Sequence, residues 1–294
     1  MENNNTYAET LREKGWILVK NFFDAETIDR FRSDCIKFSK EGSESSDLLS
    51  NKYLSHLFTD EKLVKFLADL IGGKPVYFGD SSFQIASVEG RISNGFHKDS
   101  VDRKNANGLD WGNDYSIIRL GIYLQDHRNH SEGLVVRTGS HKTIDVTKGK
   151  KVNVPSEKGD LIVWYLTTTH SGNARRIKGI DYPVLMGDFT GGWFAQKLYY
   201  HLPKILLKPS EKDRIAIFAT FGKQDIHLKR YLEYLKHRSY MVETWKKINY
   251  DCDAVEKIQT QNLLELIDMK DEAQKIDSVK YPPYDFDQFE KFNI

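Results

Sequence analysis

Cysteine is scarce in this chain: its 294 residues include two, Cys35 and Cys252. The two lie far apart in sequence and follow no metal-ligand spacing. A disulfide framework is therefore not expected, and the composition favours a reducing, cytoplasmic location.

Long apolar runs are missing as well. A membrane-spanning helix needs about 18 to 20 consecutive apolar residues, and Lys197, His201 and Pro203 interrupt the nearest stretch, residues 193–207. The first ten residues are polar and mildly acidic, so they lack the basic and then apolar pattern of a signal peptide. We expect no membrane span, while peripheral contact of residues 193–207 with a lipid or an apolar substrate stays open.

No charge of one sign dominates the chain: 43 Lys and Arg balance 42 Asp and Glu, for a formal net charge of +1. Such a balance gives no global field that would favour nucleic acid or an acidic membrane as a partner. The sequence also contains no internal repeat, low-complexity tract or clear linker. We therefore expect a single domain over residues 1–294, with a core at about 75–222, a helical cover at about 10–74 and a C-terminal helical extension at about 223–294.

Short apolar or alternating runs, separated by turn-rich pieces, fill the middle of the chain. Many short strands of this kind are typical of a sandwich or barrel. They predict a fold that is mainly β with helical decorations (α+β), built on a double-sheet jelly roll. Helices are predicted at residues 24–41, capped by Asp24, at residues 59–73, capped by Thr59, and again from about residue 224. The predicted strands lie at residues 15–23, 75–80, 82–88, 94–99, 115–125, 133–138, 150–155, 160–166, 182–190 and 213–222.

Among these runs, one contains a His-x-Asp triplet, His97-Lys98-Asp99. Alternate residues of a strand point to the same face, so the imidazole and the carboxylate are directed to one point. His130-Ser131-Glu132 fits the same loose pattern, and we interpret it as a solvated turn. The triplet alone does not distinguish metal ligands from an ordinary polar pair, and a third ligand has to come from elsewhere.

A third ligand is available where a buried strand ends. Leu161 to Leu166 form a strongly apolar run, and His170 follows shortly after it. A histidine at this place projects into the mouth of a barrel, where such folds bind ligands. Two His and one carboxylate on one face are typical of iron(II) enzymes that use oxygen.

At this point the sequence resembles the phytanoyl-CoA dioxygenase-like family of Fe(II)/2-oxoglutarate-dependent oxygenases, over roughly residues 10–222. The resemblance implies a double-stranded β-helix core, an Fe(II) ion, 2-oxoglutarate as co-substrate, and hydroxylation or another C–H oxidation that releases succinate and CO2. By matching motif positions, it implies that His97, Asp99 and His170 are the catalytic metal ligands. The matching pieces, in the family's order, are "GWILVKNFFDAETIDRFR", "GFHKDS", "GIYLQDHRNHSEGLVVRTGSHK" and "GDLIVWYLTTTHSGN".

The distal carboxylate of 2-oxoglutarate needs a buried cation, and arginine suits it because its planar fork binds a carboxylate through two parallel hydrogen bonds. In the resembling family that arginine opens the strand after the distal His. If residues 177–212 are an insertion, Arg214 opens that strand here, and we favour it. Arg175 and Arg176, directly after His170, stay open as alternatives.

Other residues near the predicted site have weaker signals. Arg119 lies inside an apolar strand and needs a partner, so it is a further candidate for the anchor. Tyr123 and Gln84 are expected to hydrogen-bond the co-substrate. His141, in a Gly-Ser-His-Lys turn, is expected to serve as scaffold, and Lys98 is expected to tolerate substitution better than its neighbours.

No motif in the sequence identifies the substrate. Residues 177–212 fit either a lid over an apolar or lipid-linked substrate or a helix packed on the barrel. An intact carboxylate ligand favours hydroxylation, since related halogenases lack it, with desaturation and ring formation as other outcomes. Two other functions stay open as alternatives: a catalytically inactive jelly-roll binding module, and a cupin-type metalloenzyme.

Overall fold

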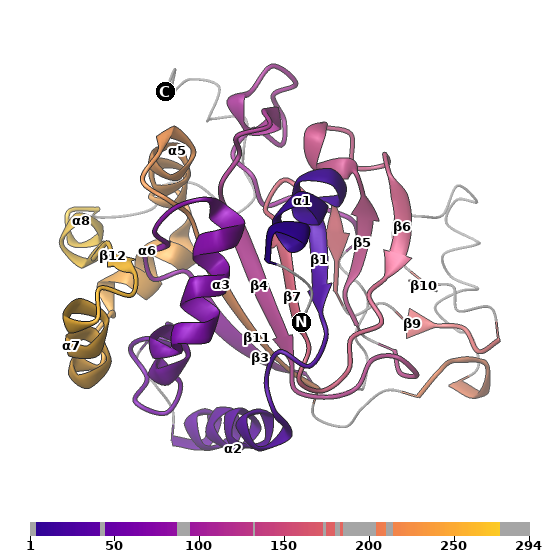
Figure 1. The fold of residues 1–294 in the computed structure, drawn as a ribbon, viewed down its shortest axis with the longest axis horizontal. Coiled ribbons are helices and arrows are strands. Elements are labelled where there is room, and N and C mark those ends of the chain that lie inside the picture. The colour runs from indigo at the N-terminus through magenta and orange to yellow at the C-terminus, as the bar shows by residue number, and fades with distance from the viewer. Residues whose placement is uncertain are drawn as a thin grey trace.

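The computed structural model of this protein describes residues 4–41, 45–86, 95–131, 133–172, 175–179, 183–184, 204–209 and 214–276. Two antiparallel sheets lie beside one another, with helices on the outer face of the larger one (Figure 1). The helices are α1 (Asn4–Lys14), α2 (Ala25–Glu41), α3 (Glu61–Ile71), α5 (Ile226–Leu235), α6 (Ser239–Lys246), α7 (Cys252–Thr260) and α8 (Lys270–Gln274). The strands are β1 (Trp16–Val19), β2 (Val76–Tyr77), β3 (Ser81–Ala86), β4 (Ile118–Tyr123), β5 (Val135–Thr138), β6 (Lys150–Asn153), β7 (Leu161–Tyr165), β8 (His170–Ser171), β9 (Arg175–Arg176), β10 (Pro183–Val184), β11 (Arg214–Phe221) and β12 (Glu265–Leu266).

The larger sheet has the strand order β1-β7-β4-β11-β3, and the smaller one the order β6-β5-β8. β11 lies between β4 and β3, so that Ile217 is paired with Ile122 on one side and with Phe83 on the other. The prediction of a core strand at residues 213–222 is therefore confirmed. Arg214 is its first residue, as the sequence predicted.

Two apolar cores lie on the two faces of the larger sheet, because successive side chains of a strand point in opposite directions. In β7, Leu161 and Val163 pack towards the helices, whereas Ile162 and Trp164 pack towards the smaller sheet. Burial on both faces explains why this strand is uniformly apolar. The core between the sheets also contains Tyr123, Leu134, Val136, Val154 and Ala216.

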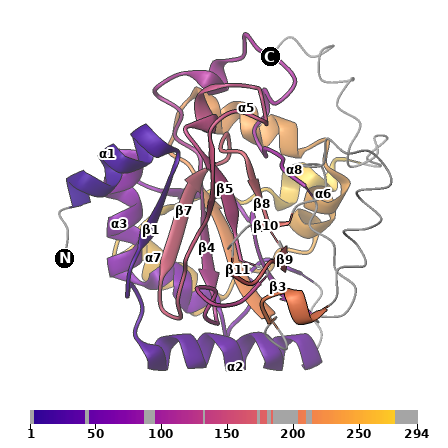
Figure 2. The ribbon, with the colours of Figure 1, turned by 90° about the vertical axis from the view of Figure 1, so that its right-hand side faces the viewer.

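Helices close the outer core, and α2 runs beneath the sheets in Figure 2. Asp24 caps α2 as predicted: its Oδ1 accepts a hydrogen bond of 2.7 Å from the Thr27 amide. The cap predicted for the next helix was wrong by one residue, since Asp60, and not Thr59, accepts from the Leu63 amide at 2.9 Å. Gly72 ends α3 in the left-handed conformation, with φ of 70°, which glycine adopts without strain.

The C-terminal extension is helical as predicted, but it also returns to the core. β12 pairs in parallel with β2, with Glu265 opposite Val76. The sequence did not predict α1, whose residues are mostly polar; Ala8 and Leu11 bury it against the outer core. Most of the predicted insertion, residues 177–212, and all of the tail, residues 281–294, lie outside the described residues.

Within the described ranges, no helix combines the length and the apolar character that crossing a membrane requires.

Gly121→Ala is expected to destabilise the protein by about 1–3 kcal/mol, because it overpacks the core between the sheets. A Cβ atom on Gly121 would lie 2.9 Å from a ring carbon of Trp164 and 3.4 Å from one of Phe218. Urea unfolding of the variant measures the loss. Gly73→Ala is the matched control, since its Cβ would meet Lys223 at an ordinary 3.6 Å. Wild-type stability of Gly121→Ala would contradict this packing.

Candidate metal centre

The three side chains predicted as metal ligands meet at one point. The Nε2 atom of His170 lies 3.5 Å from Asp99 Oδ2, and the Nε2 atom of His97 lies 3.9 Å from Asp99 Oδ1. One ligand atom from each side chain lies within 4.8 Å of the other two. Donor atoms bound to one ion at about 2 Å have separations of this order.

Main-chain pairing brings these residues together from distant parts of the sequence. His97 and His170 form an antiparallel bridge, in which their amides donate to one another's carbonyls at 3.1 and 3.0 Å. The Asp99 amide donates to the Leu166 carbonyl at 3.0 Å. Backbone pairing therefore holds all three candidate ligands next to one another.

The two imidazoles are oriented by backbone carbonyls. Nδ1 of His170 lies 3.0 Å from the Thr168 carbonyl, and Nδ1 of His97 lies 3.3 Å from the Gly95 carbonyl. A ring that donates from Nδ1 has its lone pair on Nε2. In both residues, Nε2 is the atom that faces Asp99, so the tautomers suit metal binding.

Arg119 is the main partner of the ligand carboxylate. Its Nη1 donates to Asp99 Oδ2 at 2.9 Å, its Nη2 donates to Asp80 Oδ2 at 3.1 Å, and its Nε donates to Thr220 Oγ1 at 3.0 Å. Burial by itself would raise the pKa of Asp99, but Arg119, together with His170, outweighs it and holds that pKa well below its usual range. Asp99 is therefore a carboxylate at neutral pH, which is the form that binds a cation.

His170 is suited to metal binding for a different reason. Burial, followed by the proximity of His97, lowers the pKa of His170 to about 4. The imidazole is then neutral near pH 7, and a neutral ring is required of a metal ligand.

A cavity of about 250 Å³ opens on these three side chains. Its walls combine an apolar floor from the core between the sheets with polar groups from β3, β4, β11 and α6. The lining residues are Asp80, Ser81, Ser82, Gln84, His97, Asp99, Arg119, Tyr123, Leu134, Trp164, His170, Gly172, Arg214, Phe218 and Tyr240.

Three of the residues predicted to bind the co-substrate line this cavity: Arg214, Tyr123 and Gln84. Arg214 is 1% exposed, and its guanidinium carbon lies 5.1 Å from the centre of the Tyr123 ring. Burial raises the pKa of Tyr123, against the opposing effect of Arg214. The cavity therefore contains a buried cation next to a neutral phenol.

The alternative arginines are placed differently. Arg176 is 5% exposed, and its Nη1 donates to the carbonyls of His127, Arg128 and His130 at 2.6, 3.1 and 3.1 Å. It supports a loop and does not line the cavity. Arg175 lies in β9, and its side chain is outside the described residues.

Sequence reasoning recognised that Arg119 needs a partner but did not identify the partner. The partners are Asp80 and Asp99, so the guanidinium is engaged with two carboxylates of the protein. Asp80 and Tyr240 were missed altogether. A lone Asp after a short strand and a Tyr in a distant helix carry no local signal that would distinguish them.

Lys98 lies between two of the candidate ligands in the sequence. It does point away from the ligands, but it is 1% exposed, and its ammonium donates to the carbonyls of Ser140 and Thr167, both at 2.7 Å. Burial lowers the pKa of Lys98 to about 7. The face opposite the candidate ligands is covered by other parts of the chain, so Lys98 has a structural role of its own; that it tolerates substitution better than His97 and Asp99 stays a prediction.

Ser131 and His141 are both held by other parts of the chain. Ser131 is 1% exposed and its hydroxyl donates to the Lys208 carbonyl at 3.1 Å, so its turn is not solvated at this position. Glu132 is outside the described residues. His141 lies away from the ligands, with Nε2 3.0 Å from the Arg12 carbonyl and its ring stacked on Tyr165, as expected for a scaffold residue.

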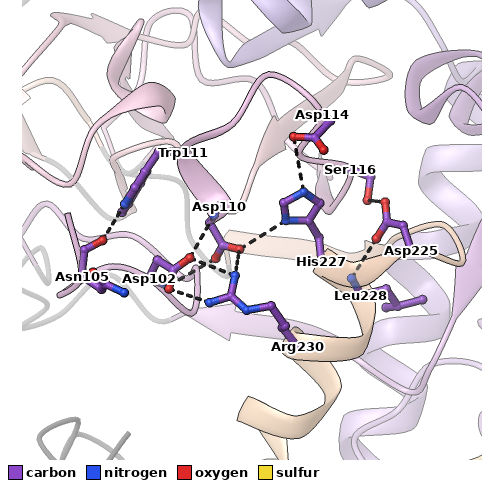
Figure 3. A network of polar contacts seen from close by, with 10 residues as sticks. All are labelled: Asp102, Asn105, Asp110, Trp111, Asp114, Ser116, Asp225, His227, Leu228 and Arg230. Atoms are coloured by element: carbon purple, nitrogen blue, oxygen red, sulfur yellow. Dashed lines mark hydrogen bonds and ion pairs between the residues drawn. The ribbon is translucent and has the colours of Figure 1, made fainter. Parts of the chain in front are cut away.

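The loop that follows Asp99 is held to α5 by a buried ionic network (Figure 3). Arg230 donates to Asp102 Oδ1 at 2.7 Å and to Asp110 Oδ1 at 3.0 Å. The Asp110 amide donates to Asp102 Oδ2 at 2.9 Å, and Nδ1 of His227 lies 3.4 Å from Asp110 Oδ1. The C-terminal extension thus fixes the segment that carries a predicted metal ligand.

Comparison of the sequence with protein-family models and with curated proteins finds no match. The fold, in contrast, is similar to that of several solved structures, among them non-haem α-ketoglutarate-dependent enzymes. SnoN, a non-haem α-ketoglutarate-dependent epimerase from nogalamycin biosynthesis, aligns with a TM-score of 0.51 and 14% identity over 75% of this chain and 82% of SnoN. AviO1 from Streptomyces viridochromogenes Tue57 aligns with a TM-score of 0.51 and 16% identity over 76% of this chain and 96% of AviO1.

EctD from S. alaskensis has the same fold, with a TM-score of 0.52 and 12% identity over 74% of this chain and 75% of EctD. SnoN has been crystallised with Fe3+, α-ketoglutarate and nogalamycin RO, and EctD with 2-oxoglutarate and 5-hydroxyectoine. At these identities the likeness establishes the fold. The neighbours are consistent with the resemblance to the phytanoyl-CoA dioxygenase-like family.

Lys98→Met is expected to destabilise the protein by about 1–3 kcal/mol, because it leaves two buried carbonyls without their donor. Denaturant unfolding followed by circular dichroism tests this. Lys257→Met, at an exposed position in α7, is the control. If both variants unfold at the wild-type denaturant concentration, the buried ammonium does not contribute as described.

Arg230→Met is expected to cost about 3–5 kcal/mol, since it removes the cation from two buried carboxylates. Lys229→Met, at the next position of the same helix but exposed, should change the stability by less than about 0.5 kcal/mol. Thermal and urea unfolding of both variants measure the difference. Equal losses in the two variants would count against the network.

Proposed function

We propose that this protein is an Fe(II)- and 2-oxoglutarate-dependent dioxygenase. The observation that carries the proposal is the convergence of His97, Asp99 and His170, with ligand atoms within 4.8 Å of one another, on a cavity that also contains a buried arginine. Two imidazoles and one carboxylate on one face form the donor set of non-haem Fe(II) oxygenases.

The donor set fits iron chemically. The Nε2 atoms are directed at the site by their Nδ1 contacts, and Asp99 is kept ionised by Arg119. Iron(II) held in this way supplies oxygen activation coupled to the conversion of 2-oxoglutarate to succinate and CO2. In this scheme, Arg119 keeps the Asp99 side chain in one orientation, since the guanidinium is itself held by Asp80.

Arg214 is the residue we assign to the distal carboxylate of 2-oxoglutarate. It opens β11, is buried, and lines the cavity that contains the three ligands. A guanidinium in this setting pairs with a carboxylate through a strong, charge-assisted contact. Tyr123 and Gln84 line the same cavity and are assigned to hydrogen bonds with the co-substrate.

Hydroxylation of an unactivated C–H bond is the reaction we favour, on a small-molecule or a lipid- or glycan-linked substrate. The neighbouring fold members include an epimerase and a carbocyclase, so the fold itself is compatible with several outcomes. We further infer that the two facing sheets form a double-stranded β-helix within a single domain, and that the enzyme acts in the cytoplasm. An inactive binding module would have no need of an intact donor set with oriented tautomers.

His97→Ala and Asp99→Ala are expected to abolish succinate formation, because each removes a metal ligand. The measurement is succinate released from 2-oxoglutarate with Fe(II), ascorbate and oxygen, in wild type and both variants. Lys229→Ala serves as an activity control on the surface of α5. The dioxygenase proposal fails if the ligand variants form succinate at the wild-type rate. It also fails if the wild type forms no succinate even when cell extracts are added as a source of substrate.

Arg214→Ala is expected to raise the apparent KM for 2-oxoglutarate by about tenfold to a hundredfold, the effect of losing a hydrogen-bonded ion pair of about 1.5–3 kcal/mol. Arg176→Ala should lower stability while leaving this KM nearly unchanged per folded molecule. Initial rates at varied 2-oxoglutarate, with folded fractions checked by circular dichroism, separate the two. The reverse order of effects would assign the anchor to Arg176.

A further inference from the structure

A second cavity, of about 230 Å³, lies on the other side of the metal-ligand segment. It is bounded by α1, by the turn that follows the short helix η2 (Leu109–Trp111), by η3 (Ser140–Lys142) and by the end of β7. The lining residues are Arg12, Gly112, Asn113, Tyr115, His141, Lys142, Tyr165 and Thr167. None of them lines the cavity at the metal centre.

The charge of this cavity is of one sign. Arg12 and Lys142 line it, and its lining contains no Asp or Glu. Neither cation forms an ion pair with any residue in the described part of the chain. Burial raises the pKa of Tyr165 to about 12 against the opposing effect of Arg12, so the guanidinium lies close to this phenol.

The walls also contain polar groups that the protein does not satisfy. The Tyr115 hydroxyl, the Thr167 hydroxyl and Nδ1 of His141 are buried and have no hydrogen-bond partner among the described residues. All three residues are less than a tenth exposed, at 6%, 1% and 7%. Unsatisfied buried polar groups are rare in folded proteins, because each costs free energy. These three atoms are fully enclosed by the protein, so the polar group that the cavity itself reaches is the Tyr165 hydroxyl, which lines it, lies on a side chain only 7% exposed and has no hydrogen-bond partner among the described residues.

Lys98 separates this cavity from the metal centre. Its neighbours His97 and Asp99 face the metal site, while its ammonium donates to the carbonyls of Ser140 and Thr167 on the other side. Thr167 itself lines the second cavity. A ligand bound there would therefore contact the same chain segments that hold Lys98.

We propose that this second cavity binds a small oxyanion carrying phosphate or carboxylate groups. Arg12 and Lys142 neutralise its charge, and the Tyr165 hydroxyl donates to one of its oxygens. Guanidinium and ammonium groups are the usual partners of such anions, and hydrogen bonds to an ionised acceptor are the strong ones. This site is independent of the proposed dioxygenase activity, since it uses none of the residues assigned to that activity.

The test is calorimetric titration of the metal-free, full-length protein with inorganic phosphate and, separately, with malonate, at constant ionic strength set with sodium chloride. We expect saturable binding with one site per chain for at least one of the two probes. The double variant Arg12→Gln/Lys142→Gln should weaken it at least about tenfold, in line with the loss of charged hydrogen bonds. Lys229→Gln/Lys257→Gln, which removes two positive charges from exposed positions elsewhere, should leave it unchanged.

The four substituted residues, Arg12, Lys142, Lys229 and Lys257, are all exposed, so these variants are expected to fold, and circular dichroism checks this. Tyr165→Phe, which removes the hydroxyl that lines the cavity, should weaken binding of the better probe while the wild-type fold is kept. The comparison of phosphate with malonate identifies the preferred anionic group. Absence of saturable binding of both probes, or equal binding by the Arg12→Gln/Lys142→Gln variant, would overturn the proposal. Because no metal or 2-oxoglutarate is present, neither result bears on the dioxygenase activity.

Discussion

The contact between Arg119 and two carboxylates is the interaction on which the site depends. Asp99 and Asp80 are both partly buried, and the Arg119 guanidinium donates to both, at 2.9 and 3.1 Å. Without that cation, the two partly buried carboxylates would repel one another, which favours the protonated form of each. With it, Asp99 stays ionised and held in place. Arg119 stands in a strand whose next inward position is Gly121, so the sheet leaves room there for the ring of Trp164.

The remaining order of the site follows from the backbone. Main-chain hydrogen bonds position the three candidate ligands. They are the bridge between His97 and His170 and the bond from the Asp99 amide to the Leu166 carbonyl. Two cations then fix the segment that contains His97 and Asp99. Lys98 donates to the carbonyls of Ser140 and Thr167, and Arg230 binds the carboxylates of Asp102 and Asp110 in the loop that follows. The helical extension is therefore part of the support of the candidate metal centre and not an appendage to the sheets.

Much of the fold and of the site could be predicted from the sequence. The uniformly apolar run of β7 indicated a buried strand. The sequence also predicted β11, with Arg214 as its first residue, although the predicted insertion, residues 177–212, separates it from His170. The pattern His-x-Asp predicted two side chains on one face, and His170 was predicted from the strand that precedes it. The burial of Lys98 was not predicted, because alternation indicates which way a side chain points but not what covers that face.

What the sequence by itself determined was local: where strands run, which of their residues share a face, and which residues have the chemistry of metal ligands or of a carboxylate anchor. The tertiary structure alone decided the partners. It paired Arg119 with Asp80 and Asp99, gave Arg176 to three carbonyls, and placed Arg214 in the cavity. The physical reason is that periodicity and capping act between neighbours in the chain, whereas burial and ion pairing depend on groups that only folding brings together.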